Sequence, residues 1–150
     1  MDDLTYLMPG DKVPDIEIPT LEQGTFRTGD NYVLLINFFT ISCPHCKRML
    51  EYIEEQIWSN FRDKGVRLVS IGREQTVEEV AAFRDEGNYS LAFAADTDRS
   101  IYSHFAEKKV PRNYLFDLEG KLVYQTRGFD PDQMNTLKAI MGELILWEKE

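Results

Sequence analysis

The hydrophobic residues of this chain fall alternately into short continuous runs and into longer stretches with helical periodicity. Residues 32–39 read Tyr-Val-Leu-Leu-Ile-Asn-Phe-Phe, an almost unbroken apolar run that is typical of a strand buried on both faces of a sheet. Beyond it, the apolar residues recur at the spacing of one helical face: Met49, Leu50, Ile53, Ile57 and Phe61. The pattern therefore predicts a buried strand followed by an amphipathic helix.

The same alternation continues through the rest of the chain. We expect a strand, a helix, a short strand and a short helix, in that order, over residues 66–71, 76–86, 91–95 and 100–106. The two strands of a hairpin and a final helix follow, over residues 113–117, over residues 121–125 and from Pro131 onward. Strands that alternate with helices indicate a largely parallel sheet, to which a hairpin adds an antiparallel edge. The predicted fold class is an α/β three-layer sandwich.

The first part of the chain lacks this alternation. Residues 1–30 are rich in turn residues and predict an extended lead-in, with a short hairpin formed by residues 16–18 and 25–27. A chain of 150 residues is long enough to build one hydrophobic core without metal or disulfide staples. We therefore expect a single domain over residues 1–150.

The composition excludes several classes of protein. The 17 Lys and Arg residues against 26 Asp and Glu give a net charge of −9, which argues against nucleic-acid binding because phosphate recognition needs clustered cations. No apolar run approaches the ~20 residues of a membrane-spanning helix, so we expect no transmembrane segment. The acidic start at Met1, Asp2 and Asp3 lacks the form of a signal peptide. An exported chain whose signal has been removed would look the same.

The motif Cys43-Pro44-His45-Cys46 stands where the buried strand passes into the amphipathic helix. Unpaired N–H groups and the helix macrodipole favour a thiolate at this position, which lowers the expected pKa of Cys43. Two intervening residues place Cys46 close enough to form a disulfide. We predict Cys43 as the attacking nucleophile and Cys46 as the resolving thiol, with no cofactor because the dithiol carries the electrons. Pro44 and His45 are expected to tune the redox potential.

The residues around this motif resemble the thioredoxin superfamily and, within it, exported redoxins of the TlpA/ResA type, which are related to AhpC/TSA proteins. The resemblance rests on Phe-Phe-Thr-Ile-Ser-Cys-Pro-His-Cys-Lys at 38–47, on Pro-Gly-Asp-Lys-Val-Pro-Asp at 9–15, and on residues 96–102 and 110–121. It implies a thioredoxin-like three-layer α/β/α sandwich with a mixed central sheet and an added β-α unit over residues 66–83. It also implies thiol–disulfide oxidoreductase activity.

The resemblance extends to a substrate groove beside the cysteines. It implies a cis peptide bond between Val110 and Pro111, with the backbone of Val110 pairing with a bound substrate chain. Ser42 stands where many relatives carry a tryptophan before the first cysteine, so an aromatic lid is lost. We expect Val110, Pro111 and Ser42 to line the groove.

The usual proton acceptors for the buried thiol are missing from this sequence. Asn37 stands where thioredoxins have a buried aspartate, and Met49 stands where exported redoxins often place a glutamate. Glu74, which follows the second strand, is the remaining candidate for a proton acceptor. The alternative is that Glu74 caps the following helix.

Other interpretations of the cysteine pair remain open. The pair could be an inert disulfide, or part of a metal- or partner-binding module with His104 as a third ligand. We predict no metal site, because His45 lies inside the motif and no fourth ligand is evident. A peroxidase is suggested by Thr40 three residues before Cys43, but Ile36 stands where peroxiredoxins have a proline.

The expected partners are proteins that carry thiols or disulfides, together with a redox partner protein, and no nucleic acid. The resemblance favours a reductant in the periplasm or cell envelope, whereas the Pro-His dipeptide favours an oxidant or isomerase. A cytoplasmic location is the alternative. We expect a monomer or a weak dimer. The last helix is apolar over more than one face, so Ile145 or Trp147 would contact another subunit or cover the domain's own sheet edge.

Overall fold

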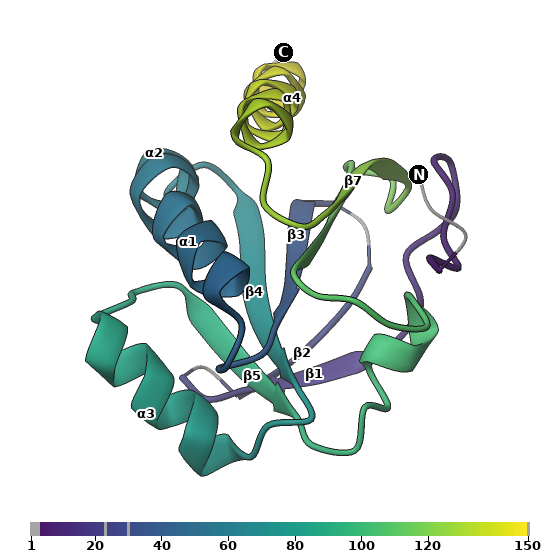
Figure 1. The fold of residues 1–150 in the computed structure, drawn as a ribbon. Helices are drawn as coiled ribbons and strands as arrows, with labels where there is room; N and C mark the ends of the chain where they lie inside the picture. Colours follow the sequence, from purple (N-terminus) through teal and green to yellow (C-terminus); the bar gives the residue numbers. More distant parts are fainter. Residues whose placement is uncertain (1–3, 23, 30, 150) are drawn as a thin grey trace.

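The computed structural model describes residues 4–22, 24–29 and 31–149, and is built around a mixed β-sheet (Figure 1). In these residues the sheet has seven strands in the order β2-β1-β5-β4-β3-β6-β7. The strands are β1 Glu17–Thr20, β2 Gly24–Arg27, β3 Val33–Phe39, β4 Val66–Arg73, β5 Ala92–Asp96, β6 Arg112–Phe116 and β7 Leu122–Arg127. The predicted α/β class with a mixed sheet is confirmed.

The apolar run of the sequence forms β3, an interior strand of the sheet between β4 and β6. Every residue of β3 is buried, as expected of a strand that is covered on both faces. β3 pairs in parallel with β4 and antiparallel with β6, and β4 pairs in parallel with β5. The predicted hairpin is formed by β6 and β7. Since β3 ends at Phe39, the cysteine motif begins just beyond the end of an interior strand.

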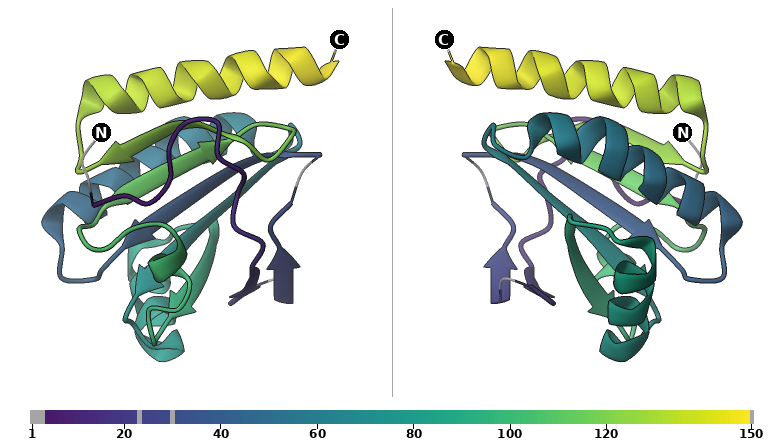
Figure 2. Two further views of the ribbon diagram at one scale, coloured as in Figure 1. Left: turned by 90° about the vertical axis from the view of Figure 1, so that its right-hand side faces the viewer. Right: turned by 90° about the vertical axis from the view of Figure 1, so that its left-hand side faces the viewer.

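Three main helical segments cover one face of the sheet (Figure 1). The helices are α1 Pro44–Tyr52, which continues through the π-helical stretch η1 Ile53–Trp58 into α2 Ser59–Phe61, then α3 Val77–Gly87, the 3₁₀ turn η2 Tyr102–His104, and α4 Pro131–Lys149. Figure 2 shows α4 running lengthwise over the sheet. Among the described helices none is long and apolar enough to cross a membrane.

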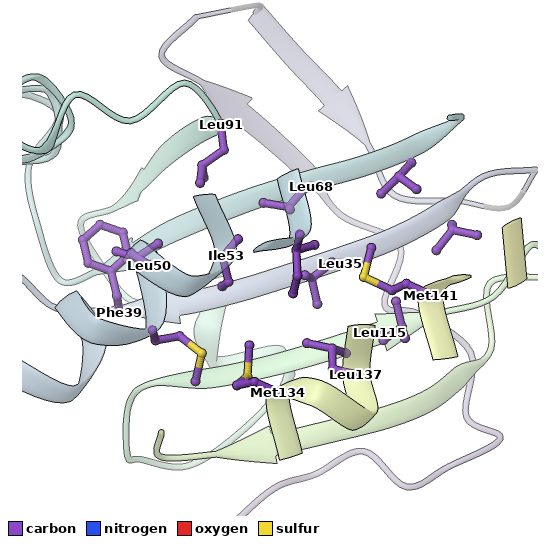
Figure 3. Packing of buried hydrophobic residues seen from close by; sticks show 14 of the residues in the cluster. Leu35, Phe39, Leu50, Ile53, Leu68, Leu91, Leu115, Met134, Leu137 and Met141 are labelled. Atoms are coloured by element: carbon purple, nitrogen blue, oxygen red, sulfur yellow. The ribbon is translucent and has the colours of Figure 1, made fainter. Parts of the chain in front are cut away.

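The larger hydrophobic core lies between the sheet and these helices. Leu35 of β3, Leu50 of α1 and Leu137 of α4 meet there and are fully buried (Figure 3). Ile145, near the end of α4, belongs to the same core and is 4% exposed. Ile145 therefore covers the domain's own sheet, and the alternative of a contact with another subunit is wrong for this residue. The side chain of Trp147 lies outside the described residues.

The opposite face of the sheet carries a smaller aromatic core. Phe38 of β3 contacts the rings of Tyr102, Phe105 and Tyr114, with centroid separations of 5.1, 5.1 and 6.2 Å. All of these rings are fully buried. This core is closed by the segment around η2 and by the N-terminal lead-in, so the second covering layer consists largely of irregular chain.

The short helix expected over residues 100–106 is a single 3₁₀ turn. The carboxylate of Asp96 accepts hydrogen bonds from the backbone N–H groups of Ile101 and Tyr102 at 3.0 and 2.8 Å, which fixes the start of the turn. The carbonyl of Phe105 accepts a bond from the N–H of Tyr6 at 2.8 Å instead of continuing a helix. The segment therefore pairs with the lead-in.

The lead-in is extended, as predicted, and its hairpin joins the main sheet. β1 and β2 pair antiparallel, and Thr20 of β1 pairs with Ala94 of β5. Further toward the N-terminus, Lys12 forms an isolated bridge with Lys121. The first part of the chain thus pairs both with β5 and with the chain between β6 and β7.

Candidate active site

Cys43 and Cys46 lie at the junction between β3 and α1. Cys43 is the N-cap of α1, with an extended backbone (φ −94°, ψ 112°), and its Sγ accepts a hydrogen bond from the backbone N–H of Cys46 at 3.2 Å. Pro44 occupies the first turn of the helix, as predicted. Both cysteines are free thiols. A sulfur that accepts an N–H at a helix start is stabilised as a thiolate.

The two sulfurs differ in their access to solvent. Cys43 is half-buried, whereas Cys46 is fully buried. Burial raises the pKa of the Cys46 thiol and its hydrogen bond with Cys43 raises it further, against smaller lowering effects from the Thr40 backbone and the charge of Arg73. Cys46 therefore keeps its proton at neutral pH, and Cys43 is the sulfur that a substrate can reach.

The loop between β3 and Cys43 is fixed from the turn that follows the neighbouring strand β4. The backbone N–H of Ile41 donates to Oε1 of Gln75 at 2.8 Å, and the N–H of Cys43 donates to the carbonyl of Thr40 at 3.3 Å. The sequence gives no signal for Gln75, because the bond joins residues 34 positions apart and depends on the pairing of β3 with β4. Gln75 is thus a positioning residue for the motif.

Ser42, Pro44 and His45 are exposed around Cys43. Nη2 of Arg48 lies 3.5 Å from Nδ1 of His45. The guanidinium of Arg48 is always charged. Arg48 then supplies the positive charge beside the motif. The role of His45 in tuning the redox potential stays a prediction.

The Val110–Pro111 peptide bond is cis, as the resemblance implies. Arg112, the next residue, pairs with Phe38 near the end of β3, so Pro111 lies beside the loop that leads to Cys43. Pro111 is buried, and the half-buried Val110 lies where the two cores meet. The structure thus brings Val110 and Pro111 to the same end of the sheet as Cys43, where β3 ends and β6 begins.

A sequence model of the AhpC/TSA family matches residues 9–125, which include both cysteines and the Val110–Pro111 bond. The chain belongs to the AhpC/TSA family. Thiol-disulfide oxidoreductase ResA of Bacillus anthracis is 23% identical to this AhpC/TSA protein over 121 residues, which cover 79% of this chain and 69% of ResA.

Solved structures resemble this AhpC/TSA protein over most of its length. The solution structure of a putative protein disulfide isomerase from Bacteroides thetaiotaomicron has a TM-score of 0.91 and 23% identity, covering 97% of this chain and 94% of that one. A secreted disulfide oxidoreductase of Mycobacterium tuberculosis, homologous to E. coli DsbE, has a TM-score of 0.72 and 17% identity, covering 84% and 96%. The implied thioredoxin-like fold is confirmed.

Neutral side chains occupy positions 37 and 49, the two positions at which the sequence resemblance directed the search for a proton acceptor. Asn37 donates through Nδ2 to Oδ1 of Asn113 at 3.1 Å and accepts a bond from the hydroxyl of Ser70. Asn113 in turn donates to Sδ of Met49 at 3.2 Å and to Oγ1 of Thr126 at 3.1 Å. All five side chains are buried. An amide and a thioether do not take up a proton at neutral pH, so neither position serves the resolving thiol as a base.

Glu74 lies in the turn after β4, with a φ of +60°. Its Oε1 is 3.5 Å from Nε of Arg73 and 3.6 Å from Nη1 of Arg99. The alternative that Glu74 caps the following helix is wrong. The cap of α3 is Thr76, which accepts a bond from the N–H of Glu79 at 3.1 Å while Glu79 accepts one from the N–H of Thr76. The role of Glu74 as proton acceptor stays a prediction.

Arg112 is a buried cation that the sequence pattern does not single out. Its side chain is fully buried at the start of β6. Nε donates to the carbonyls of Lys108 and Lys109, both at 3.1 Å, and to Oη of Tyr102 at 3.2 Å, while Nη2 donates to Lys108 at 2.7 Å. These bonds fix the segment that precedes Val110, and so position one wall of the expected groove.

The metal-binding interpretation finds little support in the described part of the chain. No three His, Cys, Asp or Glu side chains gather there in a way that would hold a metal ion. His104, the suggested third ligand, is exposed on η2, and η2 belongs to the opposite face of the sheet from α1. The site is a dithiol at a helix start.

Proposed function

We propose that this chain is a thiol–disulfide oxidoreductase that exchanges its Cys43–Cys46 dithiol with disulfides of other proteins through a mixed disulfide. One observation carries the proposal. A half-buried Cys43 begins helix α1, accepts a hydrogen bond from the backbone of Cys46, and has that fully buried thiol one turn behind it. The matched thiol-disulfide oxidoreductase ResA and the matched disulfide oxidoreductase support the same activity.

The proposed reaction has two exchange steps. The Cys43 thiolate bonds to one sulfur of the substrate disulfide, and the second substrate sulfur leaves with the electron pair as a thiolate. Cys46 then loses its proton and attacks Cys43, so that the Cys43–Cys46 disulfide forms and the first substrate sulfur leaves. The substrate gains two electrons and, from Cys46 and solvent, two protons. A dithiol that carries both electrons needs no cofactor.

The groove beside Cys43 is proposed to receive an extended segment of the substrate. Val110 and Pro111 lie at the same end of the sheet as Cys43, and Ser42 is exposed next to it. The backbone of Val110 would pair with the substrate as a short added strand. Arg112 donates hydrogen bonds to the carbonyls of Lys108 and Lys109, which precede Val110. These bonds would keep the backbone of Val110 in place for the substrate. Ser42, being small, leaves the groove open.

The proposed partners are substrate proteins and a separate redox protein that restores the pair after each turnover. We propose an extracytoplasmic location, in the periplasm or cell envelope, as opposed to the cytoplasm. The similar protein of Mycobacterium tuberculosis is described as secreted, and protein disulfides persist in oxidising compartments.

Insulin reduction by dithiothreitol tests the proposed activity. The wild-type protein is expected to shorten the lag before the reduced insulin chains precipitate, which is followed as turbidity. The same protein with its thiols alkylated is the matched control and is expected to leave the uncatalysed time course unchanged. Equal time courses for the two preparations would reject the proposal, and tight retention of Zn²⁺ or Cu⁺ in that case would indicate a binding module.

A further inference from the structure

The loop before β6 carries two adjacent lysines whose backbone is held from inside the domain. The carbonyl of Lys108 accepts hydrogen bonds from Nε and Nη2 of Arg112 at 3.1 and 2.7 Å. The carbonyl of Lys109 accepts one from Nε of Arg112 at 3.1 Å and another from the hydroxyl of Tyr102. Arg112 and Tyr102 are fully buried, and a buried charge is costly unless it is hydrogen-bonded. These bonds therefore hold both carbonyls toward the interior.

The backbone of Lys109 has a conformation that lysine rarely adopts. Its φ is +85°, in the left-handed region, where the β-carbon of any residue other than glycine is crowded. Such a backbone persists only where the surrounding structure imposes it, and it is most frequent at functional sites. Because glycine would occupy this position without strain, the side chain of Lys109 costs stability. This cost favours a functional role for the lysine.

Both lysine side chains are exposed beside the expected groove. Lys108 and Lys109 directly precede the Val110–Pro111 bond and are exposed to solvent. Because β6 begins beside the end of β3, the segment that leads into β6 lies next to the loop that leads to Cys43. Val110 and Cys43 also pack against the same hydrophobic core. The two ammonium groups are thus attached to the part of the chain that lines the groove.

Helix α1 adds a further cation at the motif. Nη2 of Arg48 lies 3.5 Å from Nδ1 of His45, and both side chains are exposed. Lys47 is also exposed, but it lines a surface hollow between α1 and α3 together with Glu51 and Glu86, whose carboxylates offset its charge. The motif therefore has effective cations on α1, at Arg48, and in the loop before β6.

The carboxylates at this end of the sheet offset only part of this charge. Oε1 of Glu74 lies 3.5 Å from Nε of Arg73 and 3.6 Å from Nη1 of Arg99, so its charge is compensated there. Glu107 is exposed and precedes Lys108, and it offsets one of the two lysines. Together, residues 43–48 and 107–109 carry four cations and one carboxylate, in a chain whose net charge is −9.

We propose that these cations select substrate segments in which acidic side chains flank the reacting cysteine. The inference rests on the proposed function, in which an extended segment pairs with Val110 while Cys43 attacks. Attraction between cations and carboxylates would hasten formation of the mixed disulfide and disfavour basic segments. The net charge of −9 acts in the opposite direction, because at long range it repels an acidic segment. The local cations and the net charge therefore predict opposite orders of substrates.

Salt separates the local cations from the net charge. At about 0.1 M salt the screening length is about 10 Å, so charges close to Cys43 act on a bound segment while most of the protein surface is screened. At about 1 M salt the screening length falls to about 3 Å, and both effects become small. A preference for acidic segments that is present at the lower concentration and lost at the higher one would therefore come from the local cations.

Three capped pentapeptides with a central cysteine test the selection. The two residues on each side of the cysteine are all glutamate, all glutamine or all lysine, because side chains alternate along an extended segment. The cysteine carries a 2-pyridyl disulfide. When the Cys43 thiolate bonds to the peptide sulfur, 2-thiopyridone leaves with the electron pair and takes up a proton, and its absorbance gives the second-order rate constant. Division by the rate constant for β-mercaptoethanol corrects for the reactivity of each disulfide.

At about 0.1 M salt we expect the wild-type protein to react with the glutamate peptide about five- to tenfold faster than with the lysine peptide. This ratio should approach one at about 1 M salt. Lys108→Glu/Lys109→Glu is expected to bring the ratio below one. Arg62→Glu/Lys64→Glu is the matched control, since it makes the same change in charge at exposed positions before β4, at the opposite end of the sheet. Its ratio should stay within about twofold of the wild-type value.

A wild-type ratio near or below one at about 0.1 M salt would overturn the inference, because the net charge would then decide. Equal lowering of the ratio by the loop variant and by the control would also overturn it. Arg48→Gln changes an exposed position on α1 and is expected to lower the ratio about twofold whether or not the loop variant folds; an unchanged ratio would contradict the role of Arg48. The ratio compares two peptides with one protein, so a change in the reactivity of Cys43 itself cancels. A wild-type protein that attacks none of the three peptides would overturn the proposed function, and with it this inference.

Discussion

Cys43→Ser is expected to abolish insulin reduction, leaving only the rate of dithiothreitol alone. The serine hydroxyl does not ionise near neutral pH, so it cannot replace the thiolate that opens the substrate disulfide. Cys46→Ser is expected to act differently, because Cys43 remains half-buried at the start of α1 and still attacks. The reaction then stops at the mixed disulfide, which no second thiol of the chain can resolve.

The two variants are distinguished on a non-reducing gel after reaction with a disulfide-bonded substrate and quenching with a maleimide. Cys46→Ser should show a band at the summed mass of protein and substrate that dithiothreitol removes, and Cys43→Ser should show none. The double variant is the control for contacts that do not involve sulfur. An adduct on Cys43→Ser that exceeds the one on Cys46→Ser would mean that Cys46 is the attacking sulfur.

Phe38→Ala is expected to lower the free energy of unfolding by about 3–5 kcal/mol, the usual cost of emptying an aromatic site in a core. Phe38 is fully buried on the face of β3 that η2 and the lead-in cover. It contacts Tyr102, Phe105 and Tyr114, so its removal leaves three rings facing a cavity. Urea denaturation followed by tryptophan fluorescence and circular dichroism measures the loss.

Val77→Ala is the matched control for this prediction. Val77 begins α3 and is 52% exposed, so its truncation should change the free energy of unfolding by no more than about 0.5 kcal/mol. A loss below about 1 kcal/mol in Phe38→Ala would show that the aromatic core repacks around the missing ring. The layer formed by η2 and the lead-in would then be less ordered than the contacts of Phe38 indicate.

Local sequence patterns were sufficient to predict most of this fold. The apolar run of β3 and the helical spacing after it each depend on residues that are close in the chain, and both elements form where the pattern places them. The cysteine motif is predictable for the same reason, because a strand followed by Pro44 determines which sulfur begins the helix. The cis conformation of the Val110–Pro111 bond could be predicted only from the resemblance to a family.

Contacts between distant strands could not be predicted from these patterns. Gln75 accepts a hydrogen bond from the loop at Ile41, and Arg112 donates to carbonyls before Val110. From sequence alone, a glutamine in a turn and an arginine at the start of a strand are both expected to be exposed. The neutral side chain of Asn37 is visible in the sequence. Its hydrogen bond with Asn113 could not be predicted, because it depends on the register between β3 and β6.

The helix cap shows a different limit. Glu74 and Thr76 are both reasonable caps, and a difference of two residues in where the turn ends decides between them. The left-handed backbone of Glu74 carries its side chain toward Arg73 and Arg99. Thr76 then closes the capping box with Glu79.

Equilibration with glutathione buffers tests most directly whether Cys43 and Cys46 exchange electrons reversibly as a pair. After acid quenching and alkylation, mass spectrometry gives the fraction of protein that carries an internal disulfide. We expect one reversible two-electron transition, near the thioredoxin end at about −270 mV for a reductant or near about −120 mV for an oxidant, and no internal disulfide in Cys43→Ser or Cys46→Ser. A pair that stays reduced throughout, or that forms only glutathione adducts, would contradict the account.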